Sequence, residues 1–173
     1  MSGGSEREFE LNDGTVISFE TLREVLKWVA AHRGNIADLN KANIPVQFQR
    51  VDKPIFRGVC FQTKDYDRFL KQGYQGKYYE SWTTDFFVAK DFAEYSDGLI
   101  SIVFKFTPKT CILNVSKFLH DPQIEKHSKK RFPKLWGLAC DMRKEAEIIM
   151  DGAEISLTKD DITWRRDFDI EDL

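Results

Sequence analysis

The sequence predicts an α+β fold with mainly antiparallel sheets. Helical patterns come early in the 173-residue chain, whereas strand-like patterns dominate its later part. Gly-rich phosphate-binding loops of the Rossmann or P-loop type do not occur in the sequence, which argues against the usual dinucleotide-binding folds. These two observations favour a mixed fold over a doubly wound parallel one.

The N-terminal section contains a clear helical pattern. Ser18 can cap a helix in which apolar residues such as Leu22 and Val25 recur at helical spacing. Gly34 is placed to end this helix. Pro45 cannot continue a helix, so we expect the N-terminal helical section to close there.

The rest of the chain predicts further helices and a series of strands. KPIFRGVCF predicts a buried strand, and TKDYDRFLKQG a helix that Thr63 caps and Gly73 ends. A helix after Thr84 or Asp85 should bury one stripe, formed by Val88, Ala89, Phe92 and Tyr95. GLISIVFKF alternates as a half-buried strand does. Shorter strands are expected in CILNV, EIIM, AEISLT and ITWR.

The composition is that of an ordinary globular protein. Charged residues make up 31% of the chain and hydrophobic residues 42%. A chain of this length can bury a sizeable core without disulfides or metals. We expect a single domain over 1–173, with a flexible leader at 1–8, an N-terminal helical section at 9–51 and a core section at 53–165.

The net charge and the cysteine content limit which binding partners and which cellular compartment we expect. The formal net charge of −2 predicts no strong global attraction to nucleic acid or anionic lipid. Three widely spaced cysteines and three scattered histidines suggest neither a disulfide framework nor a metal site. No segment approaches the roughly 18 apolar residues of a membrane span. We therefore expect a cytoplasmic protein without a metal.

EKHSKKRFPK, at 125–134, is a local basic run that we expect in a loop. Such runs are most often solvated faces. The other interpretation is contact with an acidic target or with a nucleic acid backbone.

Three polar features interrupt apolar strands: Arg57, the hydroxyl residues Ser81 and Thr83, and the pair Glu145 and Glu147. A buried arginine needs an anionic partner, either a glutamate or a ligand phosphate. Alternation in a strand places Ser81 and Thr83 on one face, and it likewise places Glu145 and Glu147 on one face. The two glutamates could also simply lie at a solvated strand end, because charged residues are common at strand ends.

The order of these features resembles the arginine-serine-glutamate class of mono-ADP-ribosyltransferases. The resemblance spans roughly 53–158 and looks closest to the Mod ADP-ribosyltransferases of T4-type bacteriophages. It is carried by PIFRGV, the hydroxyl motif SWTTD, VAKDFA, LISIVFKF and EAEIIMDGAEISL. The hydroxyl motif here is Ser-Trp-Thr and not Ser-Thr-Ser, which keeps both hydroxyls. The resemblance implies a split pair of small sheets that form a cleft for NAD, with 53–165 as the catalytic core.

The resemblance also implies a role for each polar residue. Glu147 would stabilise positive charge on the ribose as the bond to nicotinamide breaks, and Ser81 would orient it. Arg57 would hold a phosphate or a ribose, and Gly58 would contact the nicotinamide amide through its backbone. Glu145 would bind and help to deprotonate an arginine of the target protein. Thr83 is a further candidate NAD contact.

The resemblance implies an NAD-dependent transferase that modifies arginine on target proteins, and we expect a monomeric phage enzyme that acts on host proteins in the host cytoplasm. Two alternatives remain open. One is an NAD-using enzyme with another acceptor, either water or a target protein to which it joins NAD-capped RNA. The other is a non-catalytic binding module on the same fold.

Overall fold

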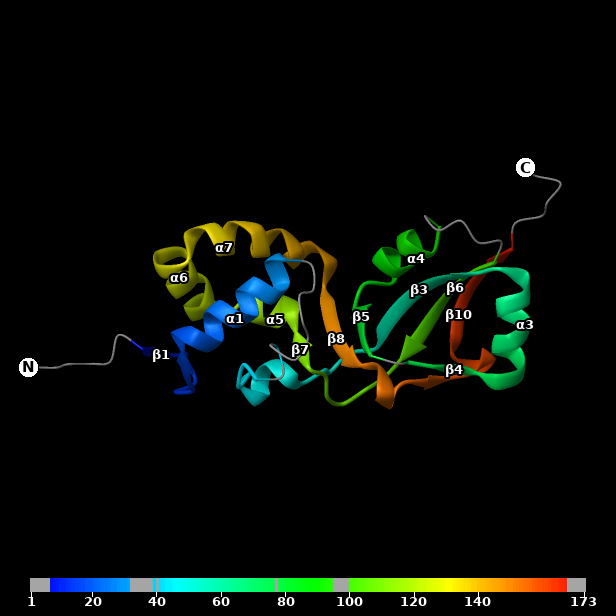
Figure 1. The fold of residues 1–173 in the computed structure, drawn as a ribbon, viewed down its shortest axis with the longest axis horizontal. Helices are drawn as coiled ribbons and strands as arrows, with labels where there is room; N and C mark the ends of the chain where they lie inside the picture. The colour runs from blue at the N-terminus through cyan, green and yellow to red at the C-terminus, as the bar shows by residue number, and fades with distance from the viewer. Residues whose placement is uncertain (1–6, 32–38, 40, 77, 95–99, 168–173) are drawn as a thin grey trace, which may run out of the picture. The chain divides into compact units, whose positions relative to one another are not determined.

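The computed structural model describes residues 7–31, 39, 41–76, 78–94 and 100–167, and the chain folds into two compact units (Figure 1). Unit 1 comprises Met1–Arg50 and Ile112–Lys144, and unit 2 comprises Val51–Cys111 and Glu145–Leu173. The segment Ile112–Lys144, which we expected inside a continuous core section at 53–165, therefore packs with the N-terminal section. Most of the expected leader, residues 1–6, lies outside the described residues.

Unit 1 is mainly helical. Its longest described helix, α1 (Phe19–Ala30), begins as predicted, because the Ser18 side chain accepts a hydrogen bond from the Thr21 backbone N–H at 3.0 Å. The predicted end at Gly34 lies outside the described residues. The buried stripe of α1 packs against α7 (Pro133–Ala139). The remaining elements are β1 (Glu8–Glu10), β2 (Val16–Ser18), the 3₁₀ helix η1 (Val46–Gln49), β7 (Leu113–Asn114) and α5 (Val115–Leu119).

The basic run at 125–134 is helical, so the loop prediction is wrong. Helix α6 spans Pro122–Arg131, and α7 follows after Phe132. Asp121 caps α6 by accepting from the backbone N–H groups of Gln123 and Ile124, and proline occupies the first helical position. Glu125 and Lys129 form an ion pair at 2.8 Å one turn apart. Charge alone did not reveal these helix-forming signals.

Unit 2 is built on an antiparallel sheet. Its strands lie in the order β10-β6-β3-β5-β8. The bounds are β3 (Ile55–Phe61), β5 (Tyr79–Thr83), β6 (Ile100–Phe106), β8 (Glu147–Asp151) and β10 (Ile162–Asp167). A small separate ladder joins β4 (Tyr74–Gln75) to β9 (Ser156–Leu157). The predicted α+β class with antiparallel sheets is confirmed.

The main core of unit 2 lies on one face of this sheet. Helix α3 (Thr63–Gln72) contributes Tyr66 and Phe69 to it, and Gly73 ends the helix with a positive φ of 72° as predicted. The residue that caps the start of α3 is Gln62, without a side-chain hydrogen bond, so the predicted Thr63 cap is wrong. Trp82 of β5 is 1% exposed in this core.

Strand β6 is buried on both faces, not on one. Ile102 and Phe104 enter the main core, and Val103 packs against helix α4 (Phe86–Glu94) on the opposite face. Ser101 on that same face is also fully buried, and its hydroxyl donates to the carbonyl of Ala93 at 3.0 Å. The half-buried pattern was misleading because a small serine can lie under a helix when its hydroxyl finds a partner.

Helix α4 lies close to β3 because its contact residues are small. Ala89 and Ala93 are buried, whereas Phe92 is 57% exposed, so the predicted stripe is correct only in part. Tyr95 lies outside the described residues. A Cβ atom added at Gly58 of β3 would lie 1.8 Å from the backbone oxygen of Ala89. Gly58 therefore sets how closely α4 can approach the sheet.

We expect Gly58→Ala to lower the free energy of unfolding by about 3 kcal/mol, because the added methyl group must push α4 off β3. Urea unfolding monitored by circular dichroism measures the loss. The matched control is Gly137→Ala in α7, where an added Cβ meets nothing within 4 Å and alanine favours the helix. Equal stability of the two variants would contradict the close packing.

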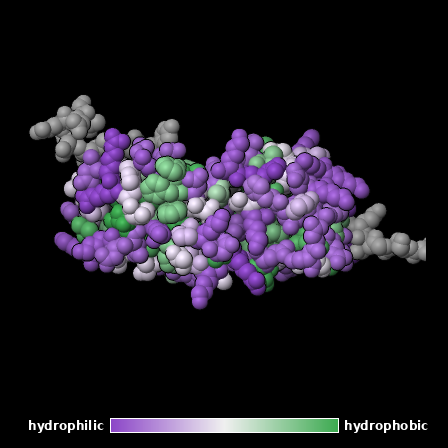
Figure 2. All heavy atoms as spheres, turned by 180° about the vertical axis from the view of Figure 1, so that it is seen from behind, coloured by the Kyte–Doolittle hydropathy of each residue, from purple (hydrophilic) through white to green (hydrophobic). Residues whose placement is uncertain are grey.

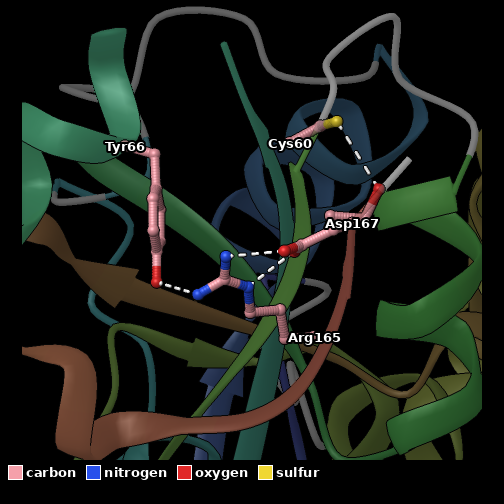
Figure 3. A network of polar contacts seen from close by, with 5 residues as sticks. Cys60, Tyr66, Arg165 and Asp167 are labelled. Carbon is pink, nitrogen blue, oxygen red and sulfur yellow. Dashed lines mark hydrogen bonds and ion pairs between the residues drawn. The ribbon is translucent and has the colours of Figure 1, made fainter. Parts of the chain in front are cut away.

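A polar cluster ties α3 to the edge strand β10 (Figure 3). Arg165 donates to the Tyr66 hydroxyl at 2.6 Å and to both carboxylate oxygens of Asp167, at 2.6 and 2.8 Å. These bonds raise the pKa of Arg165 and lower the pKa of Asp167. Because Arg165 and Asp167 are well exposed, solvent screens the pair, and we assign the cluster a packing role.

The outer surface is largely hydrophilic on the face shown in Figure 2, with smaller apolar areas between the charged residues. None of the helices within the described residues is long and apolar enough to cross a membrane.

Candidate active site

The sheet of unit 2 divides between β3 and β5. Strand β3 pairs with β6 along its whole length, but with β5 only at Phe56 and Thr83. Strand β5 pairs fully with β8 instead. If the antiparallel register continued past Phe56, Gly58 would face Ser81. We call the place where the two ladders separate the fork, defined by residues 56–58 and 81–83.

Arg57 bridges the fork. Its guanidinium Nη1 donates to the backbone oxygen of Ser81 at 2.7 Å, across strands that no longer pair there. A charged donor makes this a strong hydrogen bond. The Nε atom of Arg57 is buried, and among the described residues it has no hydrogen-bond partner. One nitrogen of the guanidinium, Nη1, is therefore already used in a hydrogen bond to the protein backbone.

Ser81 and Glu147 meet on the face of the sheet opposite the main core. In the register Glu147 faces Thr83, which places Ser81 diagonally two residues along the same face. The Ser81 hydroxyl donates to Glu147 Oε1 at 2.9 Å. Glu147 is 3% exposed. This bond restricts the orientation of a buried carboxylate.

Glu145 does not lie on the same strand as Glu147, so the prediction of two acids on one strand face is wrong. Glu145 is the last residue of the 3₁₀ helix η2 (Cys140–Glu145), and Ala146 has a positive φ of 49°. Strand β8 begins only at Glu147. A non-glycine residue with positive φ is rare, and the sequence gives no signal for it here.

The backbone around Glu145 is nonetheless held at the fork. The Thr83 hydroxyl donates to the Glu145 carbonyl at 2.6 Å, and the Thr84 N–H donates to the Ala146 carbonyl at 3.1 Å. The same Thr83 oxygen accepts from the N–H of Asp85 at 3.0 Å, at the start of α4. Thr83 thus has structural bonds that fix where Glu145 lies, besides the NAD contact that we predicted for it.

Sequence reasoning missed Glu80, which lies next to Ser81. Glu80 is 6% exposed, and its carboxylate accepts hydrogen bonds from the Tyr74 hydroxyl and from Trp82 Nε1, the latter at 3.2 Å. Burial, followed by the hydrogen bond and the charge of Glu80, raises the pKa of Tyr74 to about 12, whereas Arg57 acts to lower it. The signal available in the sequence was the acidic residue Glu80 itself, which stands directly before Ser81 in an otherwise apolar strand.

Two aromatic residues of unit 2 differ in their surroundings. Tyr78 is 79% exposed, whereas Phe86 packs edge-on against Phe56, a residue of the fork. Within the described residues, His, Cys, Asp and Glu do not form a group of three or more that could hold a metal ion.

The structure thus joins Arg57, Ser81 and Glu147 by hydrogen bonds, although they lie on three different strands. Such an arrangement combines a fixed cation, a hydroxyl and a buried carboxylate, the groups that can bind a phosphorylated ligand and stabilise positive charge on it. Comparison of the chain with protein-family models, curated proteins and solved structures found no match of any of the three kinds.

Proposed function

We propose that unit 2 is an NAD-dependent mono-ADP-ribosyltransferase that transfers ADP-ribose to arginine side chains of target proteins in the cytoplasm. The observation that carries the proposal is the hydrogen bond from Ser81 to the buried Glu147, next to the Arg57 bridge to the Ser81 backbone. These are the three residues that the resemblance to the arginine-serine-glutamate class selects. The division of the sheet at the fork agrees with the split sheets of that class.

In this proposal the carboxylate of Glu147 stabilises the positive charge that grows on the ribose as nicotinamide leaves. The reaction is akin to glycoside hydrolysis, in which a fixed carboxylate serves the same purpose. The stabilisation that Glu147 gives depends on preorganisation. A carboxylate that Ser81 already orients needs no rearrangement when the charge develops. Burial strengthens the effect because little water screens the charge.

Arg57 and Gly58 are proposed to bind NAD at the edge of the fork. The guanidinium has five donors, of which the described structure uses Nη1 for Ser81, so further donors can serve a phosphate or a ribose. Gly58 has a second role that the structure defines, the close packing of α4. Substitution of Gly58 therefore tests packing and NAD binding together, and substitution of Arg57 is the cleaner test.

Arg57→Lys is expected to weaken NAD binding about tenfold, because an ammonium group cannot donate to Ser81 and to the ligand with the planar geometry of guanidinium. Calorimetric titration with NAD measures the dissociation constant. Arg68→Lys on α3 is the matched control, since Arg68 is exposed and pairs only loosely with Asp65 at 3.8 Å. An unchanged affinity in Arg57→Lys would show that Arg57 does not contact NAD.

The proposal as a whole is tested by incubating the protein with labelled NAD and a bacterial lysate. Mass spectrometry of the labelled peptides should find ADP-ribose on arginine. Modification of another residue type would contradict arginine specificity, and absence of both labelling and nicotinamide release would contradict the proposed function.

Hydrolysis of NAD is the second candidate function, and one observation favours it. Glu145, the residue proposed to recruit the acceptor arginine, ends a 3₁₀ helix and is separated from β8 by Ala146. If its side chain does not reach an acceptor, water becomes the nucleophile. The labelling assay distinguishes the two, because hydrolysis releases nicotinamide without labelled peptides.

A further inference from the structure

The residues of the candidate active site all belong to unit 2, whereas unit 1 carries a concentrated positive charge. The stretch 122–139, which forms α6 and α7, has five basic residues and one acidic residue, although the whole chain has a net charge of −2. The rest of the chain therefore has a net charge of −6. All five basic side chains are exposed, as is the side chain of Leu138. We call these six residues the basic surface: Lys126, Lys129, Lys130, Arg131, Lys134 and Leu138.

Helix α6 is held in place by its inner face. Ile124 and Ser128 on this face are fully buried. His127 stacks on the aromatic ring of β1, with ring centroids 4.2 Å apart. Lys126 and Lys130 are four residues apart and lie on the outer face of the helix. The basic side chains thus project from a packed and well-anchored element.

The surroundings of the basic surface do not neutralise it. Glu125, the one acidic residue of α6 and α7, is already paired with Lys129 at 2.8 Å and with Arg143 at 3.7 Å. The other four basic residues of the surface form no ion pair within the part of the chain that the structure describes. The pKa of His127 agrees with an excess of positive charge, because burial lowers it first and the charges of two neighbouring lysines lower it further.

Helix stability explains only part of this charge. Positive charge is favourable at the C-terminal end of a helix, which accounts for Lys129, Lys130 and Arg131 in the last turn of α6. Lys134, however, stands in the first turn of α7, where the helix macrodipole disfavours a cation. Lys126 and Lys130, one helical turn apart, repel each other. The fold alone therefore does not account for these three lysines.

The chemistry of the basic surface fits a protein partner better than a nucleic acid. Leu138 is 62% exposed and lies one turn from Lys134 on α7, so an apolar contact stands beside a positive charge, as in protein interfaces. Surfaces for single-stranded nucleic acid present aromatic rings for base stacking. The large apolar side chains exposed among the described residues of unit 1 are instead Val16, Val46 and Leu138. A nucleic acid backbone would also continue from this local surface onto a chain that is otherwise negative.

We propose that the basic surface of unit 1 docks an acidic patch of the target protein, with Leu138 as the apolar contact. Because both units belong to one chain, binding at unit 1 raises the concentration of the target's arginine side chains around unit 2. The partner is a protein that carries aspartate and glutamate beside an exposed apolar side chain. The inference rests on the proposed function, since only a transferase has a target protein to modify.

The first experiment compares two variants with three charge reversals each. The surface variant combines Lys126→Glu, Lys130→Glu and Lys134→Glu. The control variant combines Lys64→Glu, Arg68→Glu and Lys71→Glu, which reverse exposed cations of α3 in unit 2 and change the net charge equally. Both are incubated at low salt with labelled NAD and a nuclease-treated bacterial lysate. We expect the surface variant to label proteins about tenfold more slowly than the wild type, and the control variant to match the wild type.

Two further rates separate docking from catalysis. Release of nicotinamide to water, and labelling of arginine methyl ester as a free acceptor, should be unchanged in the surface variant, because neither reaction needs docking. Equal loss of all three rates would overturn the proposal, as would protein labelling by the surface variant at the wild-type rate. A defect that appears only in lysate without nuclease treatment would mean that the surface binds nucleic acid, which also overturns it.

Leu138→Ala tests the apolar contact by itself. Protein labelling should slow about fivefold, and the loss should persist at high salt, where charge attraction is screened. Thermal unfolding should be unchanged, because the side chain is well exposed. Labelling of proteins by Leu138→Ala at the wild-type rate would overturn the proposed docking surface.

Failure of the proposed function would give a different result. If the wild-type protein neither releases nicotinamide nor labels any acceptor, the function fails, and crosslinking decides whether the surface binds acidic protein. A photoreactive amino acid in place of Leu138 should then crosslink peptides rich in aspartate and glutamate, and the three charge reversals should abolish these crosslinks. Crosslinks to nucleic acid, or crosslinks that survive the reversals, overturn the docking surface. Should the reversals unfold unit 1, glutamine replaces glutamate in both variants.

Discussion

Glu147→Gln is expected to slow the release of nicotinamide from NAD by about 100-fold or more, the usual scale for removal of one group that stabilises transition-state charge. The substitution preserves volume, and the amide oxygen of glutamine can still accept the hydrogen bond from Ser81. The negative charge next to the ribose is the property that is lost. Release is measured by chromatography of nicotinamide under single-turnover conditions.

Asp151→Asn is the matched control for this experiment. Asp151 ends the same strand, is exposed, and uses its carboxylate to cap the N–H of Ala153 at 2.9 Å. It should release nicotinamide at the wild-type rate. Thermal unfolding of both variants checks that neither loses its fold. Wild-type turnover by folded Glu147→Gln protein would refute the assignment of Glu147.

Glu145→Gln is expected to abolish arginine labelling while slow nicotinamide release to water continues. Guanidinium has a pKa above about 12 and needs a base to become a nucleophile, whereas water needs less help against a reactive electrophile. The fold should persist, because the fork uses the backbone carbonyl of Glu145 and not its side chain. Both activities are measured on the same sample.

The outcomes for Glu145 separate three mechanisms. Loss of labelling alone supports a role in acceptor recruitment. Equal loss of both activities would mean that Glu145 and Glu147 act as one unit, so that separate roles could not be assigned. Unchanged arginine labelling would contradict the role of Glu145 altogether. Glu154→Gln, which alters an exposed acid in the same unit, controls for the change in net charge.

The sequence predicted the elements of unit 2 well because their signals are local. The alternation of 100–106 and the positions of Gly73 and the strand around Arg57 each correspond to an element of the structure. That Ser81 lies within hydrogen-bond reach of Glu147 follows from the alternation of β5 combined with the register of β8. Only the resemblance, and not the spacing, suggested that these strands are neighbours.

The remaining features depend on long-range packing or on rare backbone conformations. Glu145 lies outside the strand because Ala146 has a positive φ. Alanine has no preference for positive φ, so the sequence does not predict this conformation. The close approach of α4 depends on Gly58 and Ala89 meeting across 31 positions of sequence. Glu80 passed as an ordinary strand residue, because its burial results from Tyr74 and Trp82 as partners. Such contacts become visible only when the chain is folded.

The late position of β8 in the chain has a consequence for synthesis. Ser81 and Glu147 are 66 positions apart, and the second segment of unit 1 lies between them. At roughly 5–20 residues per second, a ribosome needs about 3 to 13 s to cover that distance. During this time β5 lacks its fully paired neighbour and leaves a sheet edge open to wrong pairing. A nascent chain that ends at Lys144 already contains Arg57 and Ser81 but not the carboxylate, so under the proposed function it remains inactive until the following segment emerges.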